Sequence, residues 1–153
     1  MEKAYLKDIA LDIKNHSIVI LIGIEGTEKY VPIWVGNAEA MAIALGKNKI
    51  AMPRPLTHDL ITSIIMGMGG EVEKIVLTGL KENTYFAMIH IRQGESLVVI
   101  DSRPSDSIAV AIRTDAPIYM VDGMTIDPEE TPEEDAKIKE RLRIINPEDL
   151  LAY

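Results

Sequence analysis

Short apolar runs separated by turn residues make up the first part of the chain. Three of these runs predict strands: residues 5–13, 18–24 and 30–35. The first alternates imperfectly between apolar and polar positions, the second is almost continuously apolar, and each break is short enough for a hairpin. Residues 38–45 are rich in alanine and predict a helix, and Gly46 stands in the favoured position after a helix end.

A second series of runs follows residues 47–56, which contain two prolines and three positive charges and predict a loop. Thr57 is expected to cap a helix that continues through Met68. Later apolar runs predict four more strands: residues 72–81, 85–91, 97–100 and 118–121. Before the last of these, Pro104 excludes the preceding residue from the helical region, and Ser105 is expected to cap a further helix.

The two series match each other at a constant offset of 67 residues. The match runs without a gap between residues 18–45 and 85–112, where identical or similar apolar residues recur. It predicts an internal duplication of a strand, strand and helix unit, with copies that extend over about residues 5–45 and 72–112. We therefore expect an α+β domain built from two related halves.

Composition and length suit a single domain with a buried core. The 153 residues are 47% hydrophobic and 26% charged. There is no cysteine, which excludes disulfides, a thiolate nucleophile and a sulfur-ligated zinc site. The first residues lack the basic-then-apolar layout of a signal peptide, and no apolar run approaches the ~20 residues of a membrane span. We therefore expect a cytoplasmic protein without a membrane partner.

The net charge of −8 is unevenly distributed along the chain. Residues 127–153 hold nine acids and four bases, and Thr131 followed by Pro132 is typical of a helix start. We expect an acidic tail that is helical or partly disordered. The predicted domain, residues 1–126, holds 15 acids and 12 bases. A negative total is unfavourable for binding nucleic acid, but the nearly balanced body neither requires nor excludes a polyanionic substrate.

The densest group of polar residues, 101–107, falls where a strand is expected to lead into a helix. Arg103, Ser105 and Asp106 would then lie at a helix N-terminus, where free backbone N–H groups and the helix dipole attract anions such as phosphate. A simpler interpretation is that Ser105 only caps the helix, Asp106 only offsets the dipole and Arg103 pairs with Asp101. The sequence leaves both interpretations open.

A second polar group opens the helix expected after residue 56. His58 lies beside Asp59 and follows Arg54, an order that echoes the arrangement at residues 103–106. A histidine with a pKa near 6.5 serves as a general base or as a metal ligand. A surface histidine at a capped helix start explains the same residues equally well. His16 and His90 have no acid nearby and are expected to be structural.

Carboxylates at several helix starts are candidate ligands for a hard divalent cation. The repeat places Glu39 opposite Asp106, which fits either a favourable charge at each helix start or two carboxylates that a pseudo-twofold axis brings together. If the fold gathers them, Glu39, Asp59, Asp101 and Asp106 form an oxygen-ligand site for Mg²⁺ or Mn²⁺. The sequence contains no P-loop, no His-Glu-x-x-His pattern and no Gly-x-Ser-x-Gly elbow. The methionines are expected to fill gaps in the core.

Three linked motifs carry a family resemblance. They are Val31-Pro32-Ile33-Trp34-Val35-Gly36 with Glu39-Ala40, then Arg54-Pro55-Leu56-Thr57-His58-Asp59-Leu60, then Asp101-Ser102-Arg103-Pro104-Ser105-Asp106-Ser107-Ile108-Ala109. In order and spacing they resemble the bifunctional nuclease domain family, over about residues 5–125. Plant members are described as nucleases acting on DNA and RNA, and bacterial members are mostly uncharacterised. The resemblance implies a nuclease whose duplicated unit forms antiparallel strands that curl toward a barrel, with helices packed outside.

The first functional hypothesis is a metal-assisted nuclease that hydrolyses phosphodiester bonds of DNA or RNA. Its substrate-binding residues are Arg54, Arg103 and Ser105. Its metal ligands, for Mg²⁺ or Mn²⁺, are Glu39, Asp59 and Asp106. Its catalytic residues are His58, Asp59 and Asp106, with His58 activating water or protonating the leaving oxygen.

Two other hypotheses use the same residues without catalysis. In one, the protein is an oligomeric binding module for an anionic ligand or a partner protein, which the low aromatic content of 5% favours. In the other, Arg103, Asp59 and Asp106 form a buried polar network that only fixes the junction of the two repeats. Because a duplicated sheet leaves apolar edges exposed, we also expect a homo-oligomer.

Overall fold

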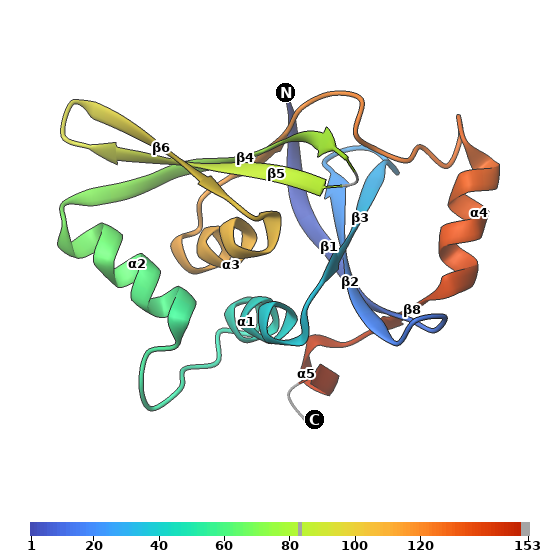
Figure 1. Cartoon of the computed structure of the whole chain (residues 1–153), viewed down its shortest axis with the longest axis horizontal. Coiled ribbons are helices and arrows are strands. Elements are labelled where there is room, and N and C mark those ends of the chain that lie inside the picture. The colour runs from blue at the N-terminus through green and yellow to red at the C-terminus, as the bar shows by residue number, and fades with distance from the viewer. Residues whose placement is uncertain (83, 151–153) are drawn as a thin grey trace.

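The computed structural model describes residues 1–82 and 84–150 and contains eight strands and five helices within them (Figure 1). The strands are β1 (Glu2–Asp12), β2 (Ser17–Ile24), β3 (Tyr30–Val35), β4 (Gly70–Lys81), β5 (Thr84–Gln93), β6 (Ser96–Ser102), β7 (Ile118–Met120) and β8 (Leu142–Ile145). The helices are α1 (Asn37–Lys47), α2 (Thr57–Gly67), α3 (Pro104–Thr114), α4 (Pro132–Arg141) and α5 (Pro147–Leu150). The predicted α+β class is confirmed.

All eight strands belong to one open sheet. Its order is β3-β2-β1-β7-β4-β5-β6, and β8 pairs with β1 beside this path. The strands are antiparallel except where the short β7 runs parallel to β4 and so joins the two halves. Because β3 and β6 remain as edges, the sheet does not close into a barrel, and the predicted curl toward a barrel stops short of closure.

Helices α1 and α3 lie side by side in the bend of the sheet, and α2 lies next to α3 (Figure 1). They cover the inner face of an open sheet, which corrects the prediction of helices packed around the outside of a barrel. Strand β2 is buried on both faces: Ile20 and Ile22 belong to the main core, whereas Val19 and Leu21 pack in a second cluster against Ile138 of α4. This double burial explains why its sequence is almost continuously apolar.

The elements of the first half recur in the second half. Strands β2 and β3 with α1 correspond to β5 and β6 with α3, and the two helices begin 67 positions apart, as in the sequence repeat. The recurrence places α1 and α3 at equivalent places against their own strands. The duplication that would account for it stays a prediction.

The two helix starts near the polar groups differ from the predicted caps. Helix α3 begins at Pro104, and the extended Arg103 is its N-cap, so Ser105 lies inside the first turn. The proline fixes this boundary because its ring holds the preceding residue in an extended conformation. In α2, Thr57 is the first helical residue, and Asp59 takes over the capping by accepting a hydrogen bond from the backbone N–H of Leu56 at 2.9 Å.

Helix α2 turns apolar side chains outward. Ile61 and Ile65 pack against the core, but Met52, Met66 and Met68 are 47–69% exposed, so the prediction that these methionines fill the core is wrong. For Met66 and Met68 the reason is that α2 packs mainly against α3 and β4, which cover one side of it, whereas Met52 lies in the loop before α2. No helix in the described part of the chain has the length and apolar character needed to cross a membrane.

The C-terminal segment is joined to the sheet. Residues 132–150 form α4, β8 and α5, and β8 pairs antiparallel with residues 9–12 of β1. This four-residue strand was not predicted because it is too short to show a period in the sequence. The division of the chain at residue 127 into a domain and an acidic tail stays a prediction.

A buried carboxylate, Asp12, fastens this segment. Its side chain is fully buried and accepts hydrogen bonds from Trp34 Nε1 at 2.9 Å, Arg141 Nη2 at 2.7 Å and the backbone N–H of Lys14 at 3.0 Å. Burial by itself raises the pKa of Asp12, but the hydrogen bonds from Trp34 and Arg141 outweigh this and lower the pKa to about 2.

We predict that Asp12→Asn lowers the free energy of unfolding at pH 7 by roughly 1.5–3 kcal/mol, because charged hydrogen bonds to Trp34 and Arg141 are lost. Since folding lowers the pKa of Asp12 from 3.8 to about 2, its contribution is complete above about pH 5 and disappears as the pH falls toward 2. Urea denaturation at several pH values should show that the free energies of unfolding of the parent protein and Asp12→Asn become equal as the pH falls toward 2. As a control, Asp122→Asn, at a side chain that is 77% exposed, should change the free energy of unfolding little at any pH. A loss of stability in Asp12→Asn that does not vary with pH would contradict the lowered pKa of Asp12.

Candidate functional site

The first turns of three helices meet around one carboxylate, that of Asp106 in α3. His58, in the first turn of α2, places Nε2 2.8 Å from Asp106 Oδ1. Arg103, the N-cap of α3, donates from Nε to Asp106 Oδ2 at 2.8 Å and from Nη2 to Oδ1 at 3.2 Å. Asp106 therefore lies between a histidine and a two-point contact with a guanidinium group.

Arg103 also reaches the neighbouring helix. Its Nη2 donates to Oε1 of Glu39, in the first turn of α1, at 3.1 Å. The two acids that the 67-residue offset places at equivalent positions thus contact the same guanidinium group. Arg103 pairs with Asp106 and Glu39 where the simpler interpretation of the sequence expected Asp101, and its side chain remains 65% exposed.

The charges around Asp106 keep it ionised. Burial acts to raise the pKa of this carboxyl, but hydrogen bonds from Arg103 and His58 lower it below its ordinary value. The His58 side chain is only 11% exposed, so the contact between His58 and Asp106 is well shielded from water. The site therefore holds a fixed anion between a buried imidazole and an exposed cation.

Asp59 takes part in a separate contact that supports α2. Its Oδ2 accepts from the backbone N–H of Leu56, and its Oδ1 accepts from Arg113 Nε at 2.8 Å. The bond from the Leu56 backbone, followed by the bond from Arg113, lowers the pKa of Asp59. Arg113 also donates to the Ala109 carbonyl at 2.9 Å, so this ion pair links α2 to α3.

The predicted metal ligands do not converge. Glu39 and Asp106 both face Arg103, and Asp59 faces Arg113. Over residues 1–82 and 84–150, no group of three or more histidine or acidic side chains is arranged to hold a metal ion. This arrangement does not fit a carboxylate site for Mg²⁺ or Mn²⁺, and metal binding by these residues stays a prediction.

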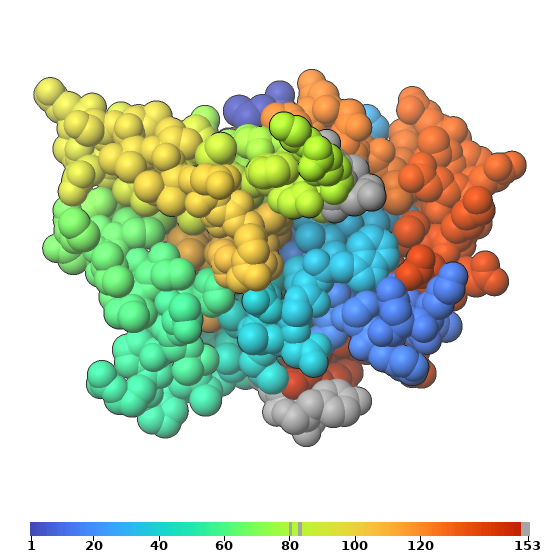
Figure 2. Space-filling view, viewed as in Figure 1, coloured from blue at the N-terminus to red at the C-terminus, as the bar shows by residue number. Residues whose placement is uncertain are grey.

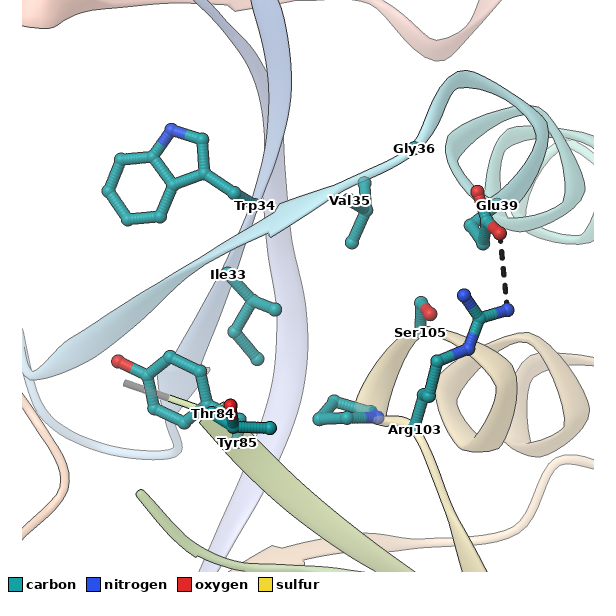
Figure 3. A pocket seen from close by; sticks show the side chains of 10 residues that line it. Ile33, Trp34, Val35, Gly36, Glu39, Thr84, Tyr85, Arg103 and Ser105 are labelled. Atoms are coloured by element: carbon teal, nitrogen blue, oxygen red, sulfur yellow. Dashed lines mark hydrogen bonds and ion pairs between the residues drawn. The ribbon is translucent and has the colours of Figure 1, made fainter. Parts of the chain in front are cut away.

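A pocket of about 300 Å³ lies beside the ion pairs, between the N-terminal ends of α1 and α3 (Figure 3). Arg103 and Glu39 stand at one end and Tyr85 at the other, whereas the Trp34 ring points away from the pocket, on the opposite side of β3 from Ile33. Neither helix has a side-chain cap, so backbone N–H groups of both first turns remain without a capping side chain. The pocket thus combines a cation, two helix N-termini and the aromatic ring of Tyr85.

The remaining predicted residues fall partly within this site. Ser105 is buried and lines the pocket. His58 contacts the cluster through Asp106 but does not line the pocket, and Arg54 is exposed in the loop between α1 and α2. The structure brings together Glu39, His58, Arg103 and Asp106, and no hydrogen bond or ion pair within the described residues joins Arg54 or Asp59 to them.

Comparison with known proteins identifies the family. A family model described as the bifunctional nuclease domain matches residues 19–130, which include every residue of the cluster. The chain belongs to the bifunctional nuclease domain family. The resemblance inferred from the three motifs is therefore confirmed.

Relatives of this bifunctional nuclease domain come from bacteria and plants. An uncharacterized protein of Mycobacterium tuberculosis is 33% identical over 153 residues, with 91% of each chain covered. A protein named bifunctional nuclease 2 from Arabidopsis thaliana is 27% identical over 108 residues, which are 69% of this chain and 33% of the plant protein. A protein named bifunctional nuclease 1 from Oryza sativa is 24% identical over 112 residues, with 71% and 34% covered. The plant relatives are thus about three times as long as the shared part.

The sequence of this bifunctional nuclease domain did not reveal two residues of the site, Arg113 and Tyr85. Arg113, the partner of Asp59, lies in the last turn of an apolar helix, and its pairing with a residue 54 positions earlier leaves no local signal. Tyr85 enters the pocket from the start of β5. Its position opposite Ile18 in the repeat gives it the appearance of an ordinary core residue.

We predict that Arg103→Ala raises the pKa of Asp106, because the variant removes two hydrogen bonds and the nearest positive charge. Titration of the Asp106 carboxyl carbon by NMR in isotope-labelled protein measures this shift directly. Arg92→Ala is the matched control, because Arg92 pairs with Glu73 on the far strands. An unchanged Asp106 titration in Arg103→Ala would mean that the guanidinium contact is not maintained in solution.

Proposed function

We propose that the protein is a nuclease that binds a phosphodiester group in the pocket between α1 and α3. The observation that carries this proposal is the position of Arg103, 65% exposed, where two uncapped helix N-termini meet. Helix N-termini and guanidinium groups both favour phosphate. Membership of a family in which plant relatives are named bifunctional nucleases supports the same conclusion.

The contacts of Arg103 suit exchange of one partner for a phosphate. Its bond to Glu39 is a single contact of 3.1 Å at an exposed guanidinium, and such surface pairs contribute little free energy. Its contact with Asp106 has two points and is more buried. A bound phosphate therefore replaces Glu39, while Asp106 continues to hold the guanidinium in position.

The Tyr85 ring extends the preference from phosphate to a nucleotide unit. Tyr85 is half-buried, so its ring offers surface to a ligand at the end of the pocket away from Arg103 (Figure 3). Nucleobases stack on such rings without sequence preference. A single-stranded segment, with its phosphate at Arg103 and its base toward Tyr85, matches the two ends of the pocket.

Hydrolysis requires a water molecule to attack phosphorus while the bond to the leaving oxygen breaks. The His58–Asp106 pair is the part of the cluster that can hold and transfer a proton, and the guanidinium of Arg103 offsets the negative charge that develops on phosphate. Since His58 does not line the pocket, in this proposal it accepts the proton of the attacking water through an intervening water molecule and returns a proton to the leaving oxygen as that bond breaks; the ionised Asp106 stabilises the imidazolium between the two transfers. Because the carboxylates of the cluster face guanidinium groups, their part in this step is to orient Arg103 and His58.

A second candidate function is a binding module that holds an anionic ligand without cleaving it. The observation that favours it is that Glu39, Asp59 and Asp106 each face an arginine, so these carboxylates are already neutralised. In that case the pocket recognises the same phosphate and base, but the cluster only positions Arg103.

We predict that Arg103→Ala lowers the rate of cleavage of labelled single-stranded RNA or DNA by about 100-fold or more while the fold is retained. His58→Gln should reduce the maximal rate by a similar factor with little change in KM, because it removes only the proton-transfer group. Arg143→Ala, at an exposed arginine on β8, is the matched control and should behave as the parent protein. Reactions with Mg²⁺, with Mn²⁺ and with a chelator determine whether a metal is needed.

The outcomes separate the two functions. Equal cleavage by the parent and Arg103→Ala would identify a contaminating nuclease and refute the proposal. Binding of an oligonucleotide without cleavage, lost in Arg103→Ala and retained in Arg143→Ala, would establish the binding module. Circular dichroism and thermal unfolding of each variant distinguish loss of function from loss of structure.

A further inference from the structure

Strand β6 is an edge strand with an unusual surface. Four consecutive large apolar residues are exposed along it: Leu97 at 45%, Val98 at 36%, Val99 at 47% and Ile100 at 44%. One side of β6 pairs with β5, and the other side presents free backbone N–H and C=O groups because β6 ends the sheet. Edge strands of monomers normally carry charges, proline or bulges that prevent further pairing, and these four positions carry none.

The exposed residues lie on both faces of β6. Val98 and Ile100 pair with Ile91 and Ile89 of β5 and so share the face that the helices cover. Leu97 and Val99 lie on the opposite face. Because neither face is covered at this edge, the strand behaves as one whose next neighbour is missing.

Helix α2 extends the apolar surface on the helix-covered side. Leu60, Ile64 and Met68 recur at intervals of four residues along its outer face and are 50–69% exposed. Figure 2 shows the green α2 segment next to the yellow β5–β6 hairpin on one face of the molecule. An exposed apolar area that joins a helix face to a sheet edge is typical of a protein interface.

We propose that two copies of this chain form a twofold dimer by antiparallel pairing of β6 with β6. Pairing of this kind extends the sheet through both molecules and satisfies the free edge groups. It also brings the α2 helices of both copies to the same face of the joined sheet. The proposal does not depend on the nuclease function.

Backbone geometry restricts the pairing to few registers. Only every second residue of β6 points its N–H and C=O groups to the free edge, and in an antiparallel pair such residues face one another. Two identical strands therefore pair with a residue on the twofold axis, and the central positions of the apolar run are Val98 and Val99.

Charge selects between these two centres. An axis at Val98 places Glu95 opposite Asp101, and two carboxylates directly opposite each other are destabilising. An axis at Val99 places Leu97 opposite Asp101, so that no carboxylate of the strand faces another. We therefore assign the axis to Val99.

The oligomeric state tests the interface. The parent protein should sediment as a dimer at micromolar concentrations, and Val99→Glu should raise the dimer dissociation constant at least about tenfold, because two carboxylates meet on the axis. In the single molecule this carboxylate is accommodated, since Val99 lies in register with His90 and Lys74. Ile144→Glu is the matched control, at a β8 residue that is 53% exposed, and should leave the dimer intact.

Disulfide formation tests the register, and the chain has no cysteine of its own. Val99→Cys places two thiols directly across the axis, where Cα atoms about 4.5–5.5 Å apart permit a disulfide. Val98→Cys places its thiols on a diagonal, with Cα atoms about 7–8 Å apart, which is too far. Mild oxidation should therefore cross-link Val99→Cys and leave Val98→Cys monomeric under denaturing conditions.

Three results would overturn the proposal. They are a monomeric parent protein, a Val99→Glu dimer as tight as that of Ile144→Glu, and cross-linking of Val98→Cys at least as fast as that of Val99→Cys. Measurement of nuclease activity is not needed for any of these tests, so failure of the dimer and failure of the proposed function are distinguishable.

Discussion

The close packing of α1 against α3 is the constraint on which the rest of the structure depends. The contact is possible because small residues line it: Ala40, Ala44 and Ala109 are fully buried. At Gly46, an added Cβ would lie 2.9 Å from Arg113 Nη1 and 3.1 Å from Ile112 Cγ2, so even alanine would displace these side chains of α3. With the helices this close, their N-termini open at the same end of the molecule, and one arginine can reach acids on both.

The same packing explains why the site lies between the halves of the protein. Each half supplies a strand, a helix N-terminus and an acid, whereas Arg103 is supplied only once. Glu39 and Asp106 stand at equivalent positions, yet only Asp106 also meets a histidine, because α2 follows the first half and packs against α3. A nearly symmetric frame thus carries an asymmetric site, with a histidine–aspartate pair on one side and an arginine–glutamate pair on the other.

Most elements could be predicted from the sequence, but contacts between distant side chains could not. Apolar runs and turns indicated the strands from β1 to β7 and helices α1 to α3, since these depend on local patterns. Arg103, Asp106 and His58 were recognised because polar residues at a helix start in an apolar setting are a local signal. The pairing of Asp59 with Arg113, of Asp12 with Arg141, and the joining of β8 to β1 depend on residues 54 to 136 positions apart. The arginines that face the predicted metal-binding carboxylates could not be placed from the sequence either, and metal binding stays a prediction.

The anchoring of Trp34 has a consequence for comparing relatives. Its indole N–H is held by Asp12, and the guanidinium of Arg141 lies over its ring, 5.7 Å from the centroid. Trp34 belongs to the segment that matches the family, residues 19–130, but both of its supports lie outside that segment. The position of β3, which also brings Ile33 and Val35 to the pocket, is therefore set in part by the flanks of the domain. Two members with the same three motifs can differ in pocket shape, and hence in the ligand they accept, through residues that an alignment of the shared segment never includes.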